Sequence, residues 1–167
     1  FIGPYRVEVK VGDGGMGVVY KCFDAKLKRF VAIKVLKERF AADWKSTERF
    51  HREAQAVASL SHPHVAQIHA IEDNPGSPPY LVMEYIDGRS ADVLLKSGPL
   101  PHARAVALVR DAALGLRAAF AKGIIRRDVK PSNILIGADG TVKIVDFGLA
   151  KEIEGTSSLT EEGLVVG

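Results

Sequence analysis

The sequence predicts an α+β fold, with strands concentrated in the first half of the chain and helices in the second. Apolar residues alternate or run together in short segments, as in β-strands, at residues 5–11, 18–23, 30–36, 65–71 and 80–85. Among them lies one segment, 43–60, whose apolar residues are three and four positions apart, which predicts a helix that packs by one face. Beyond residue 90 the longest pattern is a second helix, predicted over 101–122.

Composition is typical of an ordinary globular domain. The chain has 167 residues, of which 47% are hydrophobic and 26% charged, and this length is enough to bury a core. The net charge of +3 is too small to predict a nucleic-acid-binding protein. Cys22 is the one cysteine, which excludes an intrachain disulfide and favours a cytoplasmic location. No apolar run approaches the ~18 residues of a membrane span, so we expect no membrane contact by this segment, and an anchor elsewhere in a longer protein stays open.

A glycine-rich turn joins the first two predicted strands. It reads Gly12-Asp13-Gly14-Gly15-Met16-Gly17. Glycine permits positive φ and close backbone approach, so the exposed amides of such a turn can bind phosphate. A dinucleotide-binding turn leads into a helix, whereas β-branched and aromatic residues follow here, which argues against that site. A plain glycine-rich hairpin is the alternative to a phosphate-covering loop.

Two charged residues interrupt otherwise apolar patterns and predict an ion pair. Lys34 lies within the nearly continuous apolar strand 30–36, and Glu53 falls on the apolar face of the helix 43–60. A carboxylate on the packed face of a helix needs a partner, and Lys34 is the obvious one. The alternatives are a lysine that reaches solvent along a sheet edge and two unrelated irregularities of the pattern.

The most informative stretch is 124–147, where three polar residues stand among apolar ones. Asp128, Asn133 and Asp146 flank two short apolar segments joined by the turn 137–140, which predicts a hairpin. Carboxylates are rarely buried without a partner. Oxygen ligands of this kind suit Mg²⁺, which shares its coordination sphere with phosphate oxygens. The three residues are therefore candidate ligands of one cation.

This stretch resembles the signature motifs of eukaryotic-type protein kinases. The family's catalytic loop has His-Arg-Asp, four variable residues and Asn, and its metal-binding loop begins with Asp-Phe-Gly. The sequence reads Arg126-Arg127-Asp128-Val129-Lys130-Pro131-Ser132-Asn133 and then Asp146-Phe147-Gly148. Arg126 departs from the pattern, because the family usually has histidine there. The sequences of residues 14–20, GGMGVVY, and 128–133, DVKPSN, most resemble those of bacterial serine/threonine kinases.

The resemblance implies a protein-kinase-like fold that is truncated after the activation loop. Residues 1–86 would form the ATP-binding lobe, a five-stranded antiparallel sheet with one helix, and residues 87–167 the start of a mainly helical lobe. The implied reaction transfers the γ-phosphoryl group of ATP, with Mg²⁺, to serine or threonine hydroxyls of protein substrates. The chain alone is expected to be inactive toward proteins, because the family forms much of its substrate groove further along.

The resemblance assigns four residues to catalysis. Asp128 would orient the substrate hydroxyl and accept its proton. Lys130 would neutralise charge on the γ-phosphate. Lys34, fixed by Glu53, would hold the α- and β-phosphates.

The resemblance also assigns the cofactor sites. Asn133 and Asp146 would hold magnesium. The other ATP-binding residues would cover the phosphates, sandwich the adenine or line its edge and back: Gly12, Asp13, Gly14, Gly15, Met16, Gly17, Val19, Ala32, Met83, Glu84, Ile86 and Leu135.

Regulation and two rival functions stay open. The polar segment after Gly148 resembles an activation loop, in which Thr156 or Thr160 would be phosphorylated and would pair with Arg127. Arg126 motivates a nucleotide-binding pseudokinase that acts as a scaffold, although the other motif residues are intact. A dinucleotide-dependent enzyme is the second rival, and the strand after the glycine-rich turn argues against it.

Overall fold

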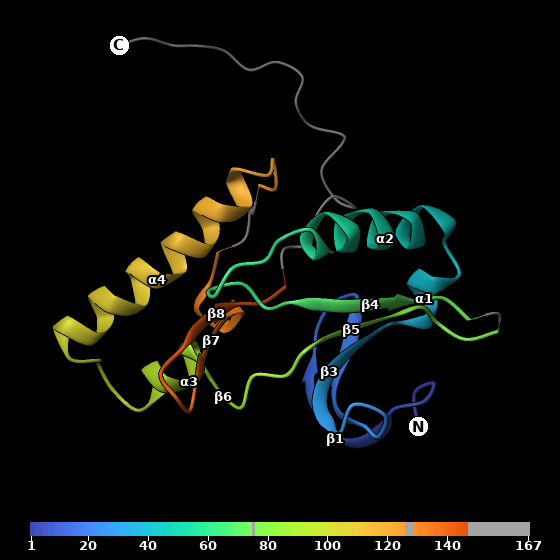
Figure 1. The fold of residues 1–167 in the computed structure, drawn as a ribbon, viewed down its shortest axis with the longest axis horizontal. Coiled ribbons are helices and arrows are strands. Elements are labelled where there is room, and N and C mark those ends of the chain that lie inside the picture. Colours follow the sequence, from blue (N-terminus) through green and yellow to red (C-terminus); the bar gives the residue numbers. More distant parts are fainter. Residues whose placement is uncertain (75, 126–128, 147–167) are drawn as a thin grey trace, which may run out of the picture.

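The computed structural model describes residues 1–74, 76–125 and 129–146. Its two sheets are antiparallel, one of five strands in the order β1-β2-β3-β5-β4 and one of three strands in the order β6-β7-β8. In Figure 1 the larger sheet and helix α2 form one half of the molecule, and the smaller sheet forms the other half with α3 and α4. The predicted five-stranded antiparallel sheet is therefore confirmed.

The elements follow the chain with short connections. The larger sheet is built from β1 (Arg6–Asp13), β2 (Gly17–Asp24), β3 (Arg29–Leu36), β4 (Ile68–Glu72) and β5 (Tyr80–Glu84). Between β3 and β4 lie α1 (Glu38–Ala41) and α2 (Trp44–Ala58). The other half contains β6 (Gly88–Ser90), α3 (Ala91–Lys96), α4 (His102–Phe120), the 3-10 turn η1 (Pro131–Asn133), β7 (Ile134–Gly137) and β8 (Val142–Ile144).

Helix α2 covers one face of the larger sheet. Asp43 caps its N-terminus, because its carboxylate accepts a hydrogen bond of 3.0 Å from the backbone N–H of Ser46. The apolar stripe predicted for this helix is buried, with Phe50 only 1% exposed. The stripe packs into one core with residues of the sheet and of the glycine-rich turn: Met16, Leu36, Ile68 and Leu81.

The opposite face of the sheet has its own core. Cys22, Val31 and Ile33 are buried there with side chains of β5, and the N-terminal turn covers them through Ile2 and Tyr5. Burial raises the pKa of the Cys22 thiol to about 11, since the thiolate would lose its hydration. Cys22 is thus an apolar packing residue at ordinary pH.

Strand β1 departs from the predicted alternation. The alternation predicts one shared face for Tyr5, Val7, Val9 and Val11, but Val9 and Val11 are 52% and 50% exposed. Two register shifts against β2, at Val7/Val9 and at Lys10/Gly12, explain the difference. Each bulge inserts a residue and reverses the facing of those that follow.

Strand β4 starts later than predicted, because Val65 and Ala66 pair elsewhere. Val65 forms an isolated parallel bridge with Ile144, and the Ala66 amide donates to the Ile144 carbonyl over 3.0 Å. The segment predicted to continue β4 therefore joins the other half of the molecule. The pairing partner is 79 residues away along the chain, beyond the reach of a local pattern.

The sequence predicts an apolar stripe for helix α4, but the helix packs by small residues instead. The predicted stripe is Val106, Val109, Ala113, Leu116 and Phe120. The buried positions are Ala112, Gly115 and Ala119, which face β8 and the segment before β4. A Cβ at Gly115 would lie 2.6 Å from the His64 carbonyl oxygen, so only glycine permits this approach. Of the predicted stripe, the larger residues Val106, Val109 and Phe120 are exposed. No helix in the described ranges has the length and apolarity needed to cross a membrane.

Candidate functional site

A partly buried ion pair joins the two halves of the molecule. Lys34, on β3, places its Nζ 2.7 Å from Oδ1 of Asp146, which follows β8. The lysine side chain is 8% exposed and the carboxylate 43% exposed, so a deeply held cation faces a partly open anion. Asp146 has a φ of +57°, a left-handed conformation that few residues other than glycine adopt.

The sequence predicts a different partner for Lys34, the carboxylate of Glu53. Glu53 lies on α2 and is partly buried, but no described ion pair or hydrogen bond joins it to Lys34. Among the described residues, the carboxylate at the Lys34 ammonium is that of Asp146, and the Lys34–Glu53 pair stays a prediction. The sequence pattern could show that Lys34 needs an anion, and it could not rank the two candidates.

The β7–β8 hairpin brings the predicted metal ligands together. The backbone N–H of Val145 donates to the Asn133 carbonyl over 3.0 Å, so Asn133 lies beside the residue that precedes Asp146. The backbone N–H of Asn133 in turn donates to the backbone carbonyl of Lys130 over 3.0 Å at the 3-10 turn. The predicted hairpin is confirmed, and its turn includes Gly140 at a φ of +86°.

The glycine-rich loop lies directly over the stem of Lys34. A Cβ at Gly17 would be 2.7 Å from the Val35 carbonyl oxygen and 3.2 Å from Lys34 Cγ, so the loop and β3 meet at a distance that only glycine permits. Within the loop, the Gly14 amide donates to the Gly17 carbonyl over 2.9 Å. The Met16 side chain, 4% exposed, is part of the core under α2. Only the backbone of Met16 is thus available to a ligand.

Basic side chains at the end of β3 hold this loop, and sequence reasoning missed them. Lys37 Nζ donates to the Gly14 carbonyl over 2.7 Å and lies 2.8 Å from Asp13 Oδ1. Arg39 donates to the Gly15 carbonyl over 3.0 Å. Hydrogen bonds from Lys10 and from Lys37 lower the pKa of Asp13 to about 2. The available signal was the position of two cations just after the strand that carries Lys34.

Apolar residues predicted to hold adenine share the face of the sheet that carries Lys34. Val19 is the register partner of Lys34, and Ala32, two residues before Lys34, is paired with Met83. No hydrogen bond between described residues uses the backbone N–H or C=O of Ile86. Leu135 comes from β7 in the smaller sheet, so the candidate adenine residues belong to both halves.

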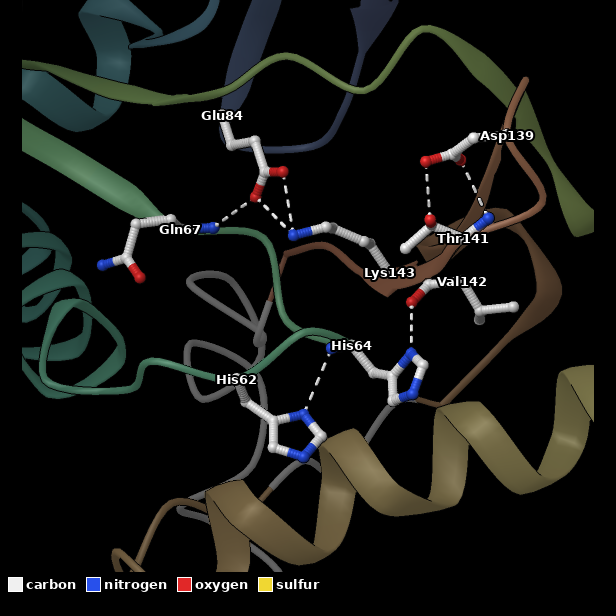
Figure 2. Close-up of polar contacts among 8 residues, drawn as sticks. All are labelled: His62, His64, Gln67, Glu84, Asp139, Thr141, Val142 and Lys143. Carbon is white, nitrogen blue, oxygen red and sulfur yellow. Dashed lines mark hydrogen bonds and ion pairs between the residues drawn. The ribbon is translucent and has the colours of Figure 1, made fainter.

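A second ion pair, between Lys143 and Glu84, also joins the two halves of the molecule. Figure 2 shows Lys143 of β8 reaching both carboxylate oxygens of Glu84, each at 2.8 Å. The backbone N–H of Gln67 donates to the same carboxylate over 3.1 Å, and the backbone N–H of Glu84 donates to the backbone carbonyl of Gln67 over 2.8 Å. Two shallow cavities, of about 280 and 290 Å³, are both bordered by Lys143, and neither is lined by Lys34 or Asp146.

Two histidines of the segment before β4, His62 and His64, form polar contacts, and one made by His64 joins the two halves of the molecule. His64 Nδ1 lies 2.9 Å from the Val142 carbonyl, so this nitrogen carries the proton and donates. The backbone N–H of His64 donates to His62 Nδ1 over 3.2 Å, as Figure 2 shows. Partial burial lowers the pKa of His62, and the neighbouring positive groups His64, Arg117 and Lys143 lower it further. His62 is therefore held as a neutral acceptor.

Several predicted residues lie outside the described ranges. They are the departing residue and the catalytic aspartate with the arginine between them, the residues after Asp146, and the candidate phosphorylation sites: Arg126, Arg127, Asp128, Phe147, Gly148, Thr156 and Thr160. The described part of the site is thus the glycine-rich loop, the catalytic and metal-ligand candidates Lys34, Glu53, Lys130, Asn133 and Asp146, and the predicted adenine residues Val19, Ala32, Met83, Glu84, Ile86 and Leu135.

Comparison with known proteins agrees with this arrangement. A family model described as "protein kinase domain" matches residues 5–165. Serine/threonine-protein kinase PknB of Mycobacterium leprae is 42% identical over 98% of this chain, and serine/threonine-protein kinase PknA of Mycobacterium tuberculosis is 40% identical over 99%. The chain spans 27% and 39% of the length of those two proteins.

Solved structures show the same fold. Crystal structures of the Mycobacterium tuberculosis PknI kinase domain superpose with TM-scores of 0.76 and 0.78 at 31% identity. They match 89% of this chain, and the match covers 60% and 62% of the PknI chains. The fold is therefore kinase-like. By its sequence and its fold, the chain belongs to the protein kinase family.

Proposed function

We propose that this chain is the ATP-binding part of a protein serine/threonine kinase. Residues 1–86 would be the ATP-binding lobe and residues 87–167 the start of the catalytic lobe, separated by the segment that follows β5. The observation that carries the proposal is the pair of Lys34 and Asp146 beneath the glycine-rich loop. A buried ammonium beside a partly exposed carboxylate provides the charges that a phosphate chain with its magnesium requires.

The backbone supports the same ligand. The amides of Gly15 and Met16 make no hydrogen bond to any described residue, so they can donate to phosphate oxygens. After β5, the backbone groups of Ile86 are equally available to the edge of a base. The larger sheet adds the apolar face of Val19, Ala32 and Met83, which suits a flat aromatic ring.

Each residue has a separate task in this proposal. Mg-ATP, when bound, supplies the phosphoryl group and neutralises part of its charge. Asp146 and Asn133 hold the metal, and Lys34 orients the phosphates through its ammonium. Lys34 and Asp146 satisfy each other here, so the buried cation keeps an anionic partner. Asp128, placed by resemblance to the family, accepts the proton of a protein hydroxyl.

A phosphotransfer assay on the full-length protein tests the proposal. Purified protein is incubated with Mg²⁺ and radiolabelled ATP, with and without a serine- and threonine-rich protein acceptor. We expect magnesium-dependent labelling of serine or threonine that falls by about 1,000-fold or more in Asp128→Asn and in Asp146→Asn, because each removes a group needed at the reacting phosphate. Asp139→Asn is the matched control, since Asp139 is an exposed carboxylate on the same hairpin that accepts from Thr141.

The alternative of a pseudokinase has a distinct result. Arg126 stands where the family usually has histidine, and this departure favours a protein that binds nucleotide without transferring phosphate. Tight Mg-ATP binding without labelling of any protein would overturn the enzymatic proposal and support a nucleotide-binding scaffold. If transfer occurs, mass spectrometry of the protein itself should find phosphate on Thr160 or Thr156, and Thr160 is the site we favour.

A further inference from the structure

The glycine-rich loop is held from outside by two cations. Lys37 Nζ donates to the Gly14 carbonyl over 2.7 Å, and Arg39 donates to the next carbonyl, that of Gly15, over 3.0 Å. Lys37 directly follows β3, and Arg39 lies in the short helix α1. Hydrogen bonds from charged donors are stronger than those between neutral groups. Two consecutive peptide groups of the loop are therefore fixed by side chains that sequence reasoning did not select.

Because the peptide group is planar, a contact that fixes a carbonyl of the loop also fixes the direction of the N–H in the same peptide unit. In a trans peptide the C=O and the N–H of the same unit point in opposite directions. The carbonyl of Gly14 belongs to the peptide unit that carries the Gly15 N–H, and the carbonyl of Gly15 to the unit that carries the Met16 N–H. These two amides are the ones that make no hydrogen bond to a described residue. Lys37 and Arg39 thus set the directions of the two donors that remain available.

The rest of the loop is anchored independently. The Met16 side chain is buried in the core under α2, and the Met16 carbonyl accepts from the Lys37 amide over 2.8 Å. Lys37 also lies 2.8 Å from Asp13 Oδ1, which positions its ammonium at the start of the loop. Glycine has the largest backbone freedom of any residue, so Gly14 and Gly15 without these contacts would sample many orientations. The contacts remove that freedom before a ligand binds.

We propose that Lys37 and Arg39 are positioning residues for the phosphates of ATP. They hold the carbonyls of Gly14 and Gly15, so that the Gly15 and Met16 amides are presented together to one phosphate group. The inference rests on the proposed function as an ATP-binding kinase. It assigns these side chains a role through the backbone and no contact with the nucleotide.

The test measures Mg-ATP and adenosine dissociation constants for variants of the full-length protein. Lys37→Met and Arg39→Met keep most of the aliphatic stem and remove the donors. We expect the dissociation constant for Mg-ATP to rise about fivefold in each and about twentyfold in the double variant, as the net contribution of one or two hydrogen bonds predicts. Adenosine has no phosphate, so its dissociation constant should stay within about twofold of wild type.

Lys10→Met is the charge-matched control. Lys10 pairs with Asp13 of the same loop at 2.6 Å, and it donates to no loop carbonyl. Its loss removes the same charge near the phosphates and leaves the peptide units held, so Mg-ATP affinity should stay within about twofold of wild type. Lys37→Arg retains a donor and should restore at least half of the lost affinity on the free-energy scale. Melting temperatures and binding stoichiometry identify any variant that fails to fold.

The possible outcomes separate the two proposals. Equal losses in Lys10→Met and in the double variant would overturn the inference, since a general charge effect would then explain the result. Equal losses for adenosine and Mg-ATP would also overturn it, because the phosphates would not be involved. If the wild-type protein itself binds Mg-ATP no more tightly than adenosine, the proposed function fails and the inference fails with it. If affinity falls only for Mg-ATP, and only in the Lys37→Met and Arg39→Met variants, the result supports both the proposed function and the inference.

Discussion

The two long helices of this chain differ in how they use their apolar residues. Helix α2 buries its apolar stripe against the larger sheet, with Phe50 1% exposed, although Trp44 at its N-terminus is 66% exposed. Helix α4 turns small residues toward β8 and leaves large ones in solvent, with Phe120 70% exposed. The first helix stabilises the structure by burying area, and the second permits a close approach between backbones. A regular apolar stripe is thus a good guide to the packed face only where no small-residue face competes with it.

The largest expected effect is the loss of stability when Phe50 of α2 is truncated, compared with the same change at Phe120 of α4. In the 167-residue chain, Phe50→Ala should lower the free energy of unfolding by about 3–5 kcal/mol, because it opens a cavity in the main core. Phe120→Ala should change it by less than about 0.5 kcal/mol, because the side chain is already in water. Urea unfolding measures both. A similar cost for the two would contradict the contrast, and a larger cost for Phe120→Ala in a longer protein would show that additional chain covers α4.

Gly115→Ala examines the close approach of α4. In an exposed helix this change adds about 1 kcal/mol of stability, since alanine has the higher helix propensity. Here the new Cβ would meet the His64 carbonyl oxygen at 2.6 Å, so we expect a loss of about 1–3 kcal/mol. Thermal unfolding of the variant decides the sign. Stabilisation would mean that the helix can move away from the 62–66 segment at little cost.

The helix caps provide a smaller contrast. Asp43 caps α2 through Ser46, whereas Ser90 precedes α3 without a side-chain cap bond. Asp43→Ala should cost about 1 kcal/mol and Ser90→Ala only a few tenths. The hydroxyl and amide of Ser46 lower the pKa of Asp43, so the cap contributes above the ordinary carboxylate pKa. Its contribution should disappear as pH falls through the lowered value, which unfolding experiments at acid pH would detect.

The smallest expected effect is a pH dependence at His62. Burial lowers the pKa of this imidazole below its ordinary 6.5, so the unfolded chain takes up a proton first as pH falls. Stability should therefore decrease from about pH 6.5 down to the lowered pKa and level off below it. His62→Asn keeps an acceptor for the His64 amide and should reduce this slope. An unchanged slope between about pH 8 and about pH 5 would assign the dependence to other histidines.

Much of the fold was predictable because it follows from local patterns. The sheet strands, the α2 stripe and the β7–β8 hairpin depend on residues close together in sequence, and they are confirmed. β6 was missed because Gly88–Ser90 has no strand pattern and is ordered only by pairing with β7. The exposure of Val9 and Val11 could not be foreseen either, because bulges depend on the register between two strands.

The candidate site was predictable as a set of residues and less so as a set of contacts. Lys34 is identifiable as a cation in an apolar strand, but its contact with Asp146 depends on how the two halves meet. Met16 looks like part of a phosphate loop, and its side chain instead belongs to the core. The roles of Lys37 and Arg39 depend on the direction of loop carbonyls, which no residue type specifies. Asp128 stays a prediction from the motif.

The pairing of Val65 and Ala66 with Ile144 has a mechanical consequence. Residues 85–87 connect the two sheets covalently, and this pairing adds a second pivot at a separate point. A body fixed at one point can turn in any direction, whereas a body fixed at two can turn only about the line that joins them. Asp146 is two residues past Ile144 along the chain, so it lies beside this second point of attachment. The glycine-rich loop joins β1 and β2, at the sheet edge opposite β4, and so lies across the sheet from this second point of attachment.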